Sequence, residues 1–244
     1  MQTTRVNRAY LQPSVEFMKI PLGSKYGELN RMGHSVRPLL AESTGFSSPA
    51  HEEHHSRRML YDLNGNRKYL TASERTAFIR SAQRASPKVE TFCLMLVYTG
   101  ARISEALALT PSRIDTEAQS IVIESLKKRS RGIYRAVPVP DFLLTQLEEV
   151  HDLQHAEPSQ RLWEWSRTTA WLRVKEIMRD ANISSTWAMP KALRHGFGVV
   201  GVADANVPLN MMQKWLGHAR IETTAIYANA VGREERAIAE RMWR

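Results

Sequence analysis

The sequence predicts a mainly helical α+β fold that contains one small antiparallel β hairpin. Apolar residues recur at helical spacing through most of the chain after residue 66, as amphipathic helices require. Two short runs, Ile121–Ile123 and Tyr134–Val139, flank a basic segment and predict the hairpin. With 43% hydrophobic residues among 244, the chain can form one large domain or two small ones.

Residues 1–66 predict no regular domain. They carry scattered Pro, Gly and Ser, and the turn-forming Asn64–Asn66 marks a boundary. His51–His55 matches the HExxH zinc pattern in form, but the Ser/Pro stretch before it predicts no helix and no third ligand is obvious. We therefore expect no metal site, an irregular segment over 1–66, and a folded domain over 67–244.

A capping box opens the first predicted helix. The Thr71 hydroxyl and the Glu74 carboxylate can each satisfy a free backbone amide, which predicts a helix to about Ala85. Ser86-Pro87 then restarts the chain.

An apolar helix follows and ends at Gly100, which is suited to a left-handed C-cap. Arg102 therefore lies just past a helix end, before a short helix from Ser104. An arginine at such a position usually caps carbonyl groups in solvent. The strongly apolar helix before Arg102 favours a more specific role.

The predicted hairpin carries a basic turn. Between residues 127 and 135 there are five basic side chains and no acidic one. Such a basic hairpin turn suits binding in a DNA groove, because cations neutralise the phosphates. The alternative is a charged loop that is simply solvated. The basic residues are Lys127, Lys128, Arg129, Arg131 and Arg135.

Two amphipathic helices are predicted next, over Asp141–His155 and Ser166–Asp180. His151 and His155 have metal-ligand spacing, but nothing nearby completes a site, so we expect both to face solvent. The inward residues of the second helix are expected to be Trp171, Leu172, Ile177 and Met178.

Three further segments complete the chain. Pro190 predicts a helix start, after which Lys191 and Arg194 share one face. Another helix begins at Pro208 and ends at Gly217, which places His218 at a sharp corner, nine residues before Tyr227.

A last helix is predicted over Arg233–Trp243, following Gly232. Its apolar face consists of Ile238, Met242 and Trp243, which are too apolar to remain comfortably in water. We therefore expect this face to be covered by another surface.

The charge balance favours a polyanionic partner. Lys and Arg number 34 against 25 Asp and Glu, which gives a net charge of +9. Nucleic acid fits this charge, and an anionic membrane surface would also attract it.

The lone cysteine, Cys93, lies in an apolar run and is expected to be buried, so no disulfide framework is implied. No run approaches the roughly 18–20 apolar residues of a membrane span, and the N-terminus has no signal-peptide pattern. We expect a cytoplasmic protein without a membrane partner.

Four ordered motifs resemble the two signature boxes of the tyrosine recombinase (phage integrase) family. They are Thr99–Glu105, Pro190–Phe197, Leu216–His218 and Thr223–Tyr227. The resemblance runs from near Lys68 to the C-terminus and implies the family's catalytic-domain fold. It implies a site-specific recombinase, with a type IB topoisomerase or a non-catalytic DNA-binding protein of the same fold as alternatives.

The residue types fit cleavage of a DNA strand by a protein side chain that replaces water as the nucleophile. Tyr227 can supply a nucleophile, although a free pKa of ~10 means that it needs a base or a cationic neighbourhood. Arg102 and Arg194 suit a phosphate clamp, because a guanidinium group holds two oxygens and stays charged. Tyr134 in the hairpin is the alternative nucleophile.

The resemblance implies the remaining roles. Lys127, with Lys128 as the alternative, would protonate the leaving 5′ oxygen. His218 would bond a non-bridging oxygen, Lys191 occupies the family's His-or-Lys position, and Glu105 would orient the cations. The hairpin residues Lys128, Arg129, Arg131 and Arg135 are expected to bind DNA.

The implied reaction proceeds through a 3′-phosphotyrosine and a Holliday junction, in a tetramer on two DNA duplexes. It requires neither metal nor cofactor, because the phosphotyrosine conserves the bond energy. A bacterial, plasmid, phage or other mobile-element setting is implied. Family members usually carry a helical domain before the catalytic one, and residues 1–66 look short and irregular for it, so DNA clamping from both sides is expected to be reduced.

Overall fold

The computed structural model describes residues 59–126, 132–229, 236 and 239–243. All of them belong to one compact unit, residues 46–244. The α-helices are α2 (Ala72–Ala82), α3 (Pro87–Thr99), α4 (Ile103–Ala106), α5 (Asp141–His151), α6 (Arg167–Asp180), α7 (Pro190–Val199), α8 (Leu209–Leu216) and α9 (Glu222–Ala225). Short 3-10 turns occupy Pro111–Arg113, Ile226–Asn229 and Glu240–Met242, and a π-helical turn occupies Val200–Asp204.

The strands form one small antiparallel sheet in the order β1 (Ile114–Asp115), β2 (Ser120–Glu124), β3 (Tyr134–Pro138). In the predicted hairpin, Val122 pairs with Ala136. Strand β1 was not predicted, because two residues carry too little periodicity to be recognised. The basic turn at 127–131 lies outside the described residues.

The capping residues act as predicted. Thr71 accepts from the Glu74 amide, and the Glu74 carboxylate accepts from the Thr71 amide at 2.9 Å. Helix α2 ends at Ala82, slightly before the predicted end. Helix α3 ends at Gly100 with φ +62°, where a Cβ atom would lie 2.6 Å from the Phe197 ring. A glycine is therefore required both for the backbone turn and for the close approach of α7.

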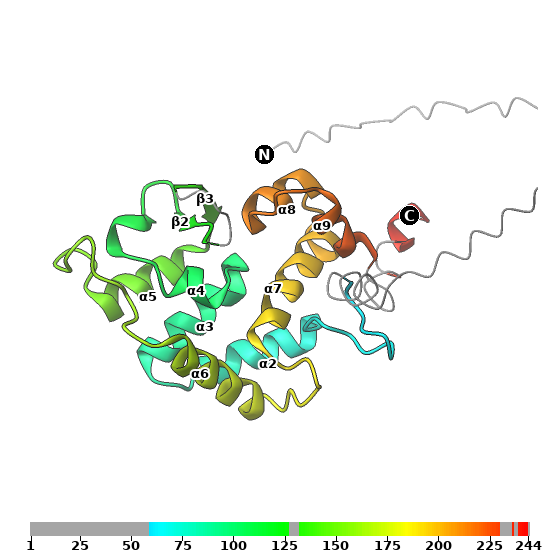
Figure 1. Cartoon of the computed structure of the whole chain (residues 1–244), viewed down its shortest axis with the longest axis horizontal. Coiled ribbons are helices and arrows are strands. Elements are labelled where there is room, and N and C mark those ends of the chain that lie inside the picture. The colour runs from blue at the N-terminus through cyan, green and yellow to red at the C-terminus, as the bar shows by residue number, and fades with distance from the viewer. Residues whose placement is uncertain (1–58, 127–131, 230–235, 237–238, 244) are drawn as a thin grey trace, which may run out of the picture. The chain divides into compact units, whose positions relative to one another are not determined.

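Helix α3 is the central core element and packs against α2, α5 and α7 (Figure 1). Its side chains from Phe92 to Val97 are at most 2% exposed, including Cys93 as predicted. A second apolar cluster joins the end of α7 to α8 and contains Met212, Leu216 and Tyr227. The predicted α+β fold is confirmed, and this second cluster brings the C-terminal motifs against α7.

Three predicted side-chain orientations are wrong. Trp171 and Leu172 are 41% and 55% exposed, because α6 turns only Ala170, Val174, Ile177 and Met178 into the core. His151 is half-buried, lies 3.2 Å from the Thr91 hydroxyl and packs edge-on against Trp163. His155 is exposed as predicted.

No helix in the described part of the chain is long and apolar enough to cross a membrane.

Candidate active site

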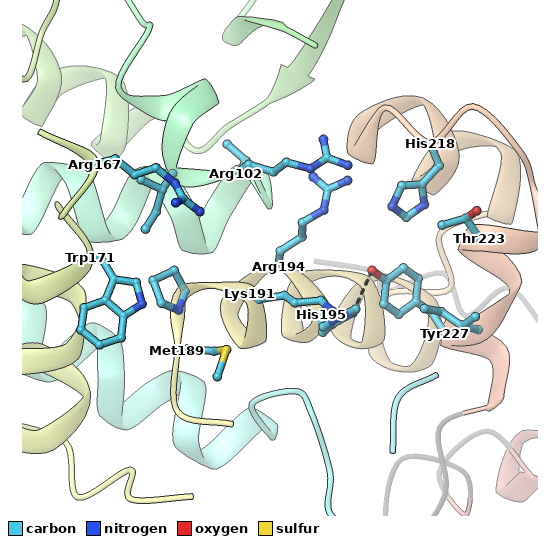
Figure 2. A pocket seen from close by; sticks show the side chains of 14 residues that line it. Arg102, Arg167, Trp171, Met189, Lys191, Arg194, His195, His218, Thr223 and Tyr227 are labelled. Carbon is cyan, nitrogen blue, oxygen red and sulfur yellow. Dashed lines mark hydrogen bonds between the residues drawn. The ribbon is translucent and has the colours of Figure 1, made fainter. Parts of the chain in front are cut away.

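A pocket of about 690 Å³ lies where the start of α4, the helices α6 and α7, and the α8–α9 region meet. Figure 2 shows Arg102 and Arg194 extending into the same part of this pocket, with His218 and Tyr227 beside them. The polar lining consists of Arg102, Arg167, Lys191, Arg194, His195, His218, Thr223 and Tyr227. The structure therefore gathers residues separated by more than one hundred positions in the sequence.

One face of α7 supplies much of the site. Lys191, Arg194, His195 and Gly198 stand at i, i+3, i+4 and i+7, which is the spacing of a single helical face. Pro190 begins the helix at its first position, as predicted. The helix thus presents two cations and an imidazole to the pocket, and Gly198 leaves room for the Tyr227 ring.

Arg194 is nearly completely buried, at 7% exposure. Its Nη1 donates to the Gly100 carbonyl at 2.7 Å, and its Nη2 donates to the Leu216 carbonyl at 2.6 Å. Burial, with a smaller contribution from Arg102, lowers its pKa to about 9, so it remains charged at neutral pH. Because it binds the ends of two helices, Arg194 is a rigid and preorganised cation.

Arg102 stands at the start of α4, just beyond Gly100. Its Nη1 donates to Glu105 Oε1 at 2.6 Å, while its backbone N–H donates to Glu105 Oε2 at 3.0 Å. About a third of the Arg102 side chain is exposed, whereas the Glu105 side chain is 1% exposed. The carboxylate therefore fixes one guanidinium edge and leaves the group accessible to the pocket.

Arg135, which is expected to bind DNA, has a buried side chain. Its Nη2 donates to Glu105 Oε2 at 2.7 Å, and its Nε donates to the Trp215 carbonyl at 2.7 Å. The side chain is 4% exposed because Arg135 points to the inner face of β3. Arg135 acts on the site through Glu105, joining the hairpin to the end of α8.

Glu105 thus accepts hydrogen bonds from two arginines, Arg102 and Arg135. Burial alone would raise the pKa of its carboxyl group, but the charges of Arg135 and Arg102 and their hydrogen bonds lower it below the usual 4.5. The group is therefore ionised at neutral pH.

His218 follows the left-handed Gly217, whose φ of +66° ends α8 as predicted. A hydrogen bond of 2.9 Å joins His218 Nδ1 to the hydroxyl of Thr224, which is fully buried. Burial, then the charges of Arg194 and Arg102, lower the pKa of His218 to about 3, so the ring is neutral at pH 7. If the Thr224 hydroxyl donates to Nδ1, the ring proton stands on Nε2 and can serve as a donor.

Tyr227 is 1% exposed but lines the pocket. Its ring lies directly over Gly198, where a Cβ atom would be 2.4 Å from Cζ, and its plane is 14° from that of His218. The hydroxyl oxygen is 3.3 Å from His195 Nδ1. Burial raises the pKa of Tyr227 to about 12, and the charges of Arg194 and Arg102 oppose this rise.

Tyr134, the alternative nucleophile, lies elsewhere. Arg113 stacks over its ring at 4.2 Å and donates to its hydroxyl at 3.1 Å, on the exposed side of strand β3. It does not line the pocket.

Five of the sequence-predicted catalytic residues therefore meet in one pocket: Arg102, Lys191, Arg194, His218 and Tyr227. The predicted acid Lys127 and the DNA-binding residues Lys128, Arg129 and Arg131 lie outside the described residues. Sequence reasoning assigned no role to His195, although it stands four residues after Lys191, nor to Thr224, three residues before Tyr227. No sequence pattern near Arg167 or Trp171 indicated that these residues line the pocket.

Known proteins resemble this chain in sequence and in fold. The sequence model of the phage integrase family matches residues 68–233. Tyrosine recombinase XerA of Pyrococcus furiosus is 28% identical over 183 residues, which cover 71% of this chain and 61% of the relative. Tyrosine recombinase XerD of Haemophilus influenzae is 26% identical, with 71% and 62% covered. The chain spans about three fifths of the length of these relatives.

Solved structures share the fold. A crystal structure of XerA recombinase gives a TM-score of 0.63 at 22% identity, covering 71% of this chain and 64% of that chain. XerH site-specific recombinase, bound to its difH substrate in a pre-cleavage complex, gives 0.59 at 20% identity, covering 83% and 68%.

Proposed function

The chain belongs to the phage integrase family, and from this premise we propose that it is a site-specific DNA recombinase acting through a 3′-phosphotyrosine. The observation that carries the proposal is the meeting of Arg102, Arg194, His218 and Tyr227 in one pocket of one chain. Two preorganised cations beside a tyrosine hydroxyl are what phosphoryl transfer to a protein nucleophile needs.

In the proposed reaction, Tyr227 Oη attacks the phosphorus, and the bond from phosphorus to the 5′ oxygen breaks as the new bond forms. Arg102 and Arg194 stabilise the charge on the non-bridging oxygens, and His218 Nε2 donates to one of them. The exposed Lys191 adds positive charge at the pocket, which favours loss of the phenol proton to water. The 5′ hydroxyl of a partner strand then reverses the step and rejoins the DNA through a Holliday junction.

The proton for the leaving 5′ oxygen is assigned to Lys127, with Lys128 as the alternative. Lys127→Ala is expected to cleave ordinary DNA slowly and to recover when the bridging oxygen is replaced by sulfur, because a thiolate leaves without protonation. Recovery of Lys128→Ala alone would instead identify Lys128 as the acid.

Double-stranded DNA with a specific recombination site is the proposed substrate. The net charge of +9 and the description of XerH as a complex with its DNA substrate support this choice. We assign contacts beyond the pocket to the basic turn of Lys128, Arg129 and Arg131, and a reduced DNA-binding role to residues 1–66. The single buried Cys93 fits the proposed cytoplasmic setting, and the mobile-element setting is carried over from the family resemblance.

The test captures the covalent intermediate. Duplexes of random sequence, each carrying a nick that lets the cleaved fragment escape, are incubated with the whole chain, and protein-linked DNA is sequenced. We expect one motif to be enriched, and Tyr227→Phe to retain DNA binding while forming no adduct. An adduct of unchanged yield with Tyr227→Phe would exclude Tyr227 as the nucleophile. Adducts without a sequence motif would favour a topoisomerase, and no adduct with wild type would favour a binding protein.

Assembly as a tetramer is proposed through the C-terminal segment. In the described part of this segment, Met242 and Trp243 are 83% and 68% exposed, which suits an apolar contact with a second protomer. Deletion of residues 233–244 is expected to leave one protomer bound per site and to remove the slower complexes in a gel-shift titration. Unchanged recombination after this deletion would refute the assignment.

A further inference from the structure

His195 is the buried polar residue of the pocket to which the reaction above gives no role. It stands on α7 directly after Arg194 and is 6% exposed. Its Nδ1 atom lies 3.3 Å from the Tyr227 hydroxyl, and Figure 2 shows this bond at the centre of the pocket lining. The ring therefore contacts the atom that the proposed reaction uses as its nucleophile.

The seat of Tyr227 has two contact points on one helix. Gly198 leaves room for the ring, since a Cβ there would lie 2.4–2.6 Å from three ring carbons. His195, three residues earlier on the same face, bonds the hydroxyl group that Cζ carries. A rigid helix therefore fixes both the plane of the ring and the direction of its oxygen.

The other ring nitrogen of His195 also indicates a functional role for this residue. Nε2 of His195 is buried and has no hydrogen-bond partner among the described residues. A buried polar atom without a partner costs stability, so a leucine at this position would pack at lower cost. The single bond that His195 makes with another side chain in the described structure goes to Tyr227. Positions that break the rules of core packing in this way are typical of functional sites.

We propose that His195 is a positioning residue for the nucleophile: its Nδ1 holds the Tyr227 hydroxyl in the direction of the phosphate clamped by Arg102 and Arg194. This proposal rests on the proposed function. It extends the site by a residue that acts through Tyr227 and does not itself touch DNA.

Holding, and not proton removal, is the role that the electrostatics favour. Burial, followed by the charges of Lys191 and Arg194, lowers the pKa of His195 to about 3. Tyr227 has a pKa raised to about 12. Transfer of the phenol proton to so weak a base is strongly unfavourable, whereas a hydrogen bond between the two groups requires no transfer.

Three substitutions separate the hydrogen bond from packing. His195→Asn keeps a hydrogen-bonding atom close to the position of Nδ1 but has a smaller volume. His195→Leu fills the space and has no such atom, and His195→Gln carries its amide one carbon further, toward the position of Nε2. Each variant is tested in single-turnover adduct formation on the duplex recovered by covalent capture, alongside DNA affinity.

We expect His195→Leu and His195→Gln to form the adduct about 100-fold more slowly than wild type, because a misaimed nucleophile loses near-attack geometry. His195→Asn is expected to stay within about tenfold of wild type, and all three to bind DNA as wild type does. A role in packing alone predicts the opposite order, with leucine better than asparagine. That order, or a leucine variant as fast as wild type, would overturn the proposal.

A measurement without DNA keeps the inference testable if the proposed function fails. Unfolding in urea is compared for wild type, Tyr227→Phe, His195→Leu and the double variant. We expect the two substitutions to be non-additive, because each removes the same bond. Additive effects would show that the bond is absent and would refute the proposal that His195 positions Tyr227. Wild type that forms no adduct would count against the recombinase function alone.

Discussion

Replacing Glu105 by glutamine is expected to destabilise this protein strongly, because the substitution removes a buried charge that two arginines share. The carboxylate is 1% exposed and accepts from Arg102 at 2.6 Å and from Arg135 at 2.7 Å. Glutamine keeps the shape but removes the charge, leaving the buried Arg135 without a counterion. Breaking a buried ion pair on one side costs about 3–5 kcal/mol, so we expect the free energy of unfolding to fall by that amount.

Urea unfolding at pH 7 measures the loss, and Glu176→Gln is the matched control. Glu176 also contacts two arginines, Arg173 at 3.3 Å and Arg179 at 3.9 Å, but its side chain is 46% exposed. Solvent screens such pairs, so the control is expected to lose less than about 1 kcal/mol. The adduct rate of Glu105→Gln is expected to fall as well, because Arg102 loses the bond that orients it.

The pH dependence follows from the sign of the pKa shift. The Glu105 pKa is lower in the folded protein than its usual 4.5, so its contribution is complete above that value and disappears as the pH falls through the folded pKa. The stability difference between wild type and Glu105→Gln is therefore expected to shrink below pH 4.5. A loss at pH 7 no larger than that of the Glu176 control would refute the reasoning.

Three further outcomes are expected. Gly198→Ala places a Cβ 2.4 Å from Tyr227 Cζ and is expected to reduce the rate of adduct formation about 100-fold, with DNA binding retained. In the control Gly201→Ala, the close contact is with the flexible end of Met212, so the adduct rate is expected to fall less. Equal adduct rates for the two variants would contradict this prediction. Thr224→Val removes the partner of His218 Nδ1 and is expected to slow the adduct about tenfold, more than the same change at the pocket residue Thr223. The free energy of unfolding is expected to fall as the pH drops below 6.5, because the unfolded chain binds a proton that the buried His195 ring, with a pKa of about 3, does not bind. His195 contributes up to about 1.4 kcal/mol per pH unit to this fall. Urea unfolding at pH 7, 6 and 5 is expected to show a weaker dependence of the unfolding free energy on pH for His195→Asn than for wild type.

Local chemistry made much of the fold predictable. The Thr71–Glu74 capping box, the C-caps Gly100 and Gly217 and the first-turn Pro190 each act through neighbours a few residues away, so their effects can be recognised without a tertiary structure. The hairpin strands were predictable for the same reason. Helix α6 was misjudged because its outward face also carries two large apolar residues, Trp171 and Leu172, and periodicity alone cannot say which side the core occupies.

The sequence by itself determined the helical α+β class, the positions of the motifs and the candidate residues Arg102, Lys191, Arg194, His218 and Tyr227. Only the tertiary structure decided what those residues touch. Arg135 belongs to a basic segment in the sequence, yet it is buried against Glu105, because burial depends on which strand face meets α8. His195 gains its partner from a residue 32 positions away, and no local pattern encodes that contact. Motif spacing reports short-range geometry, whereas charge pairing and burial arise from long-range packing.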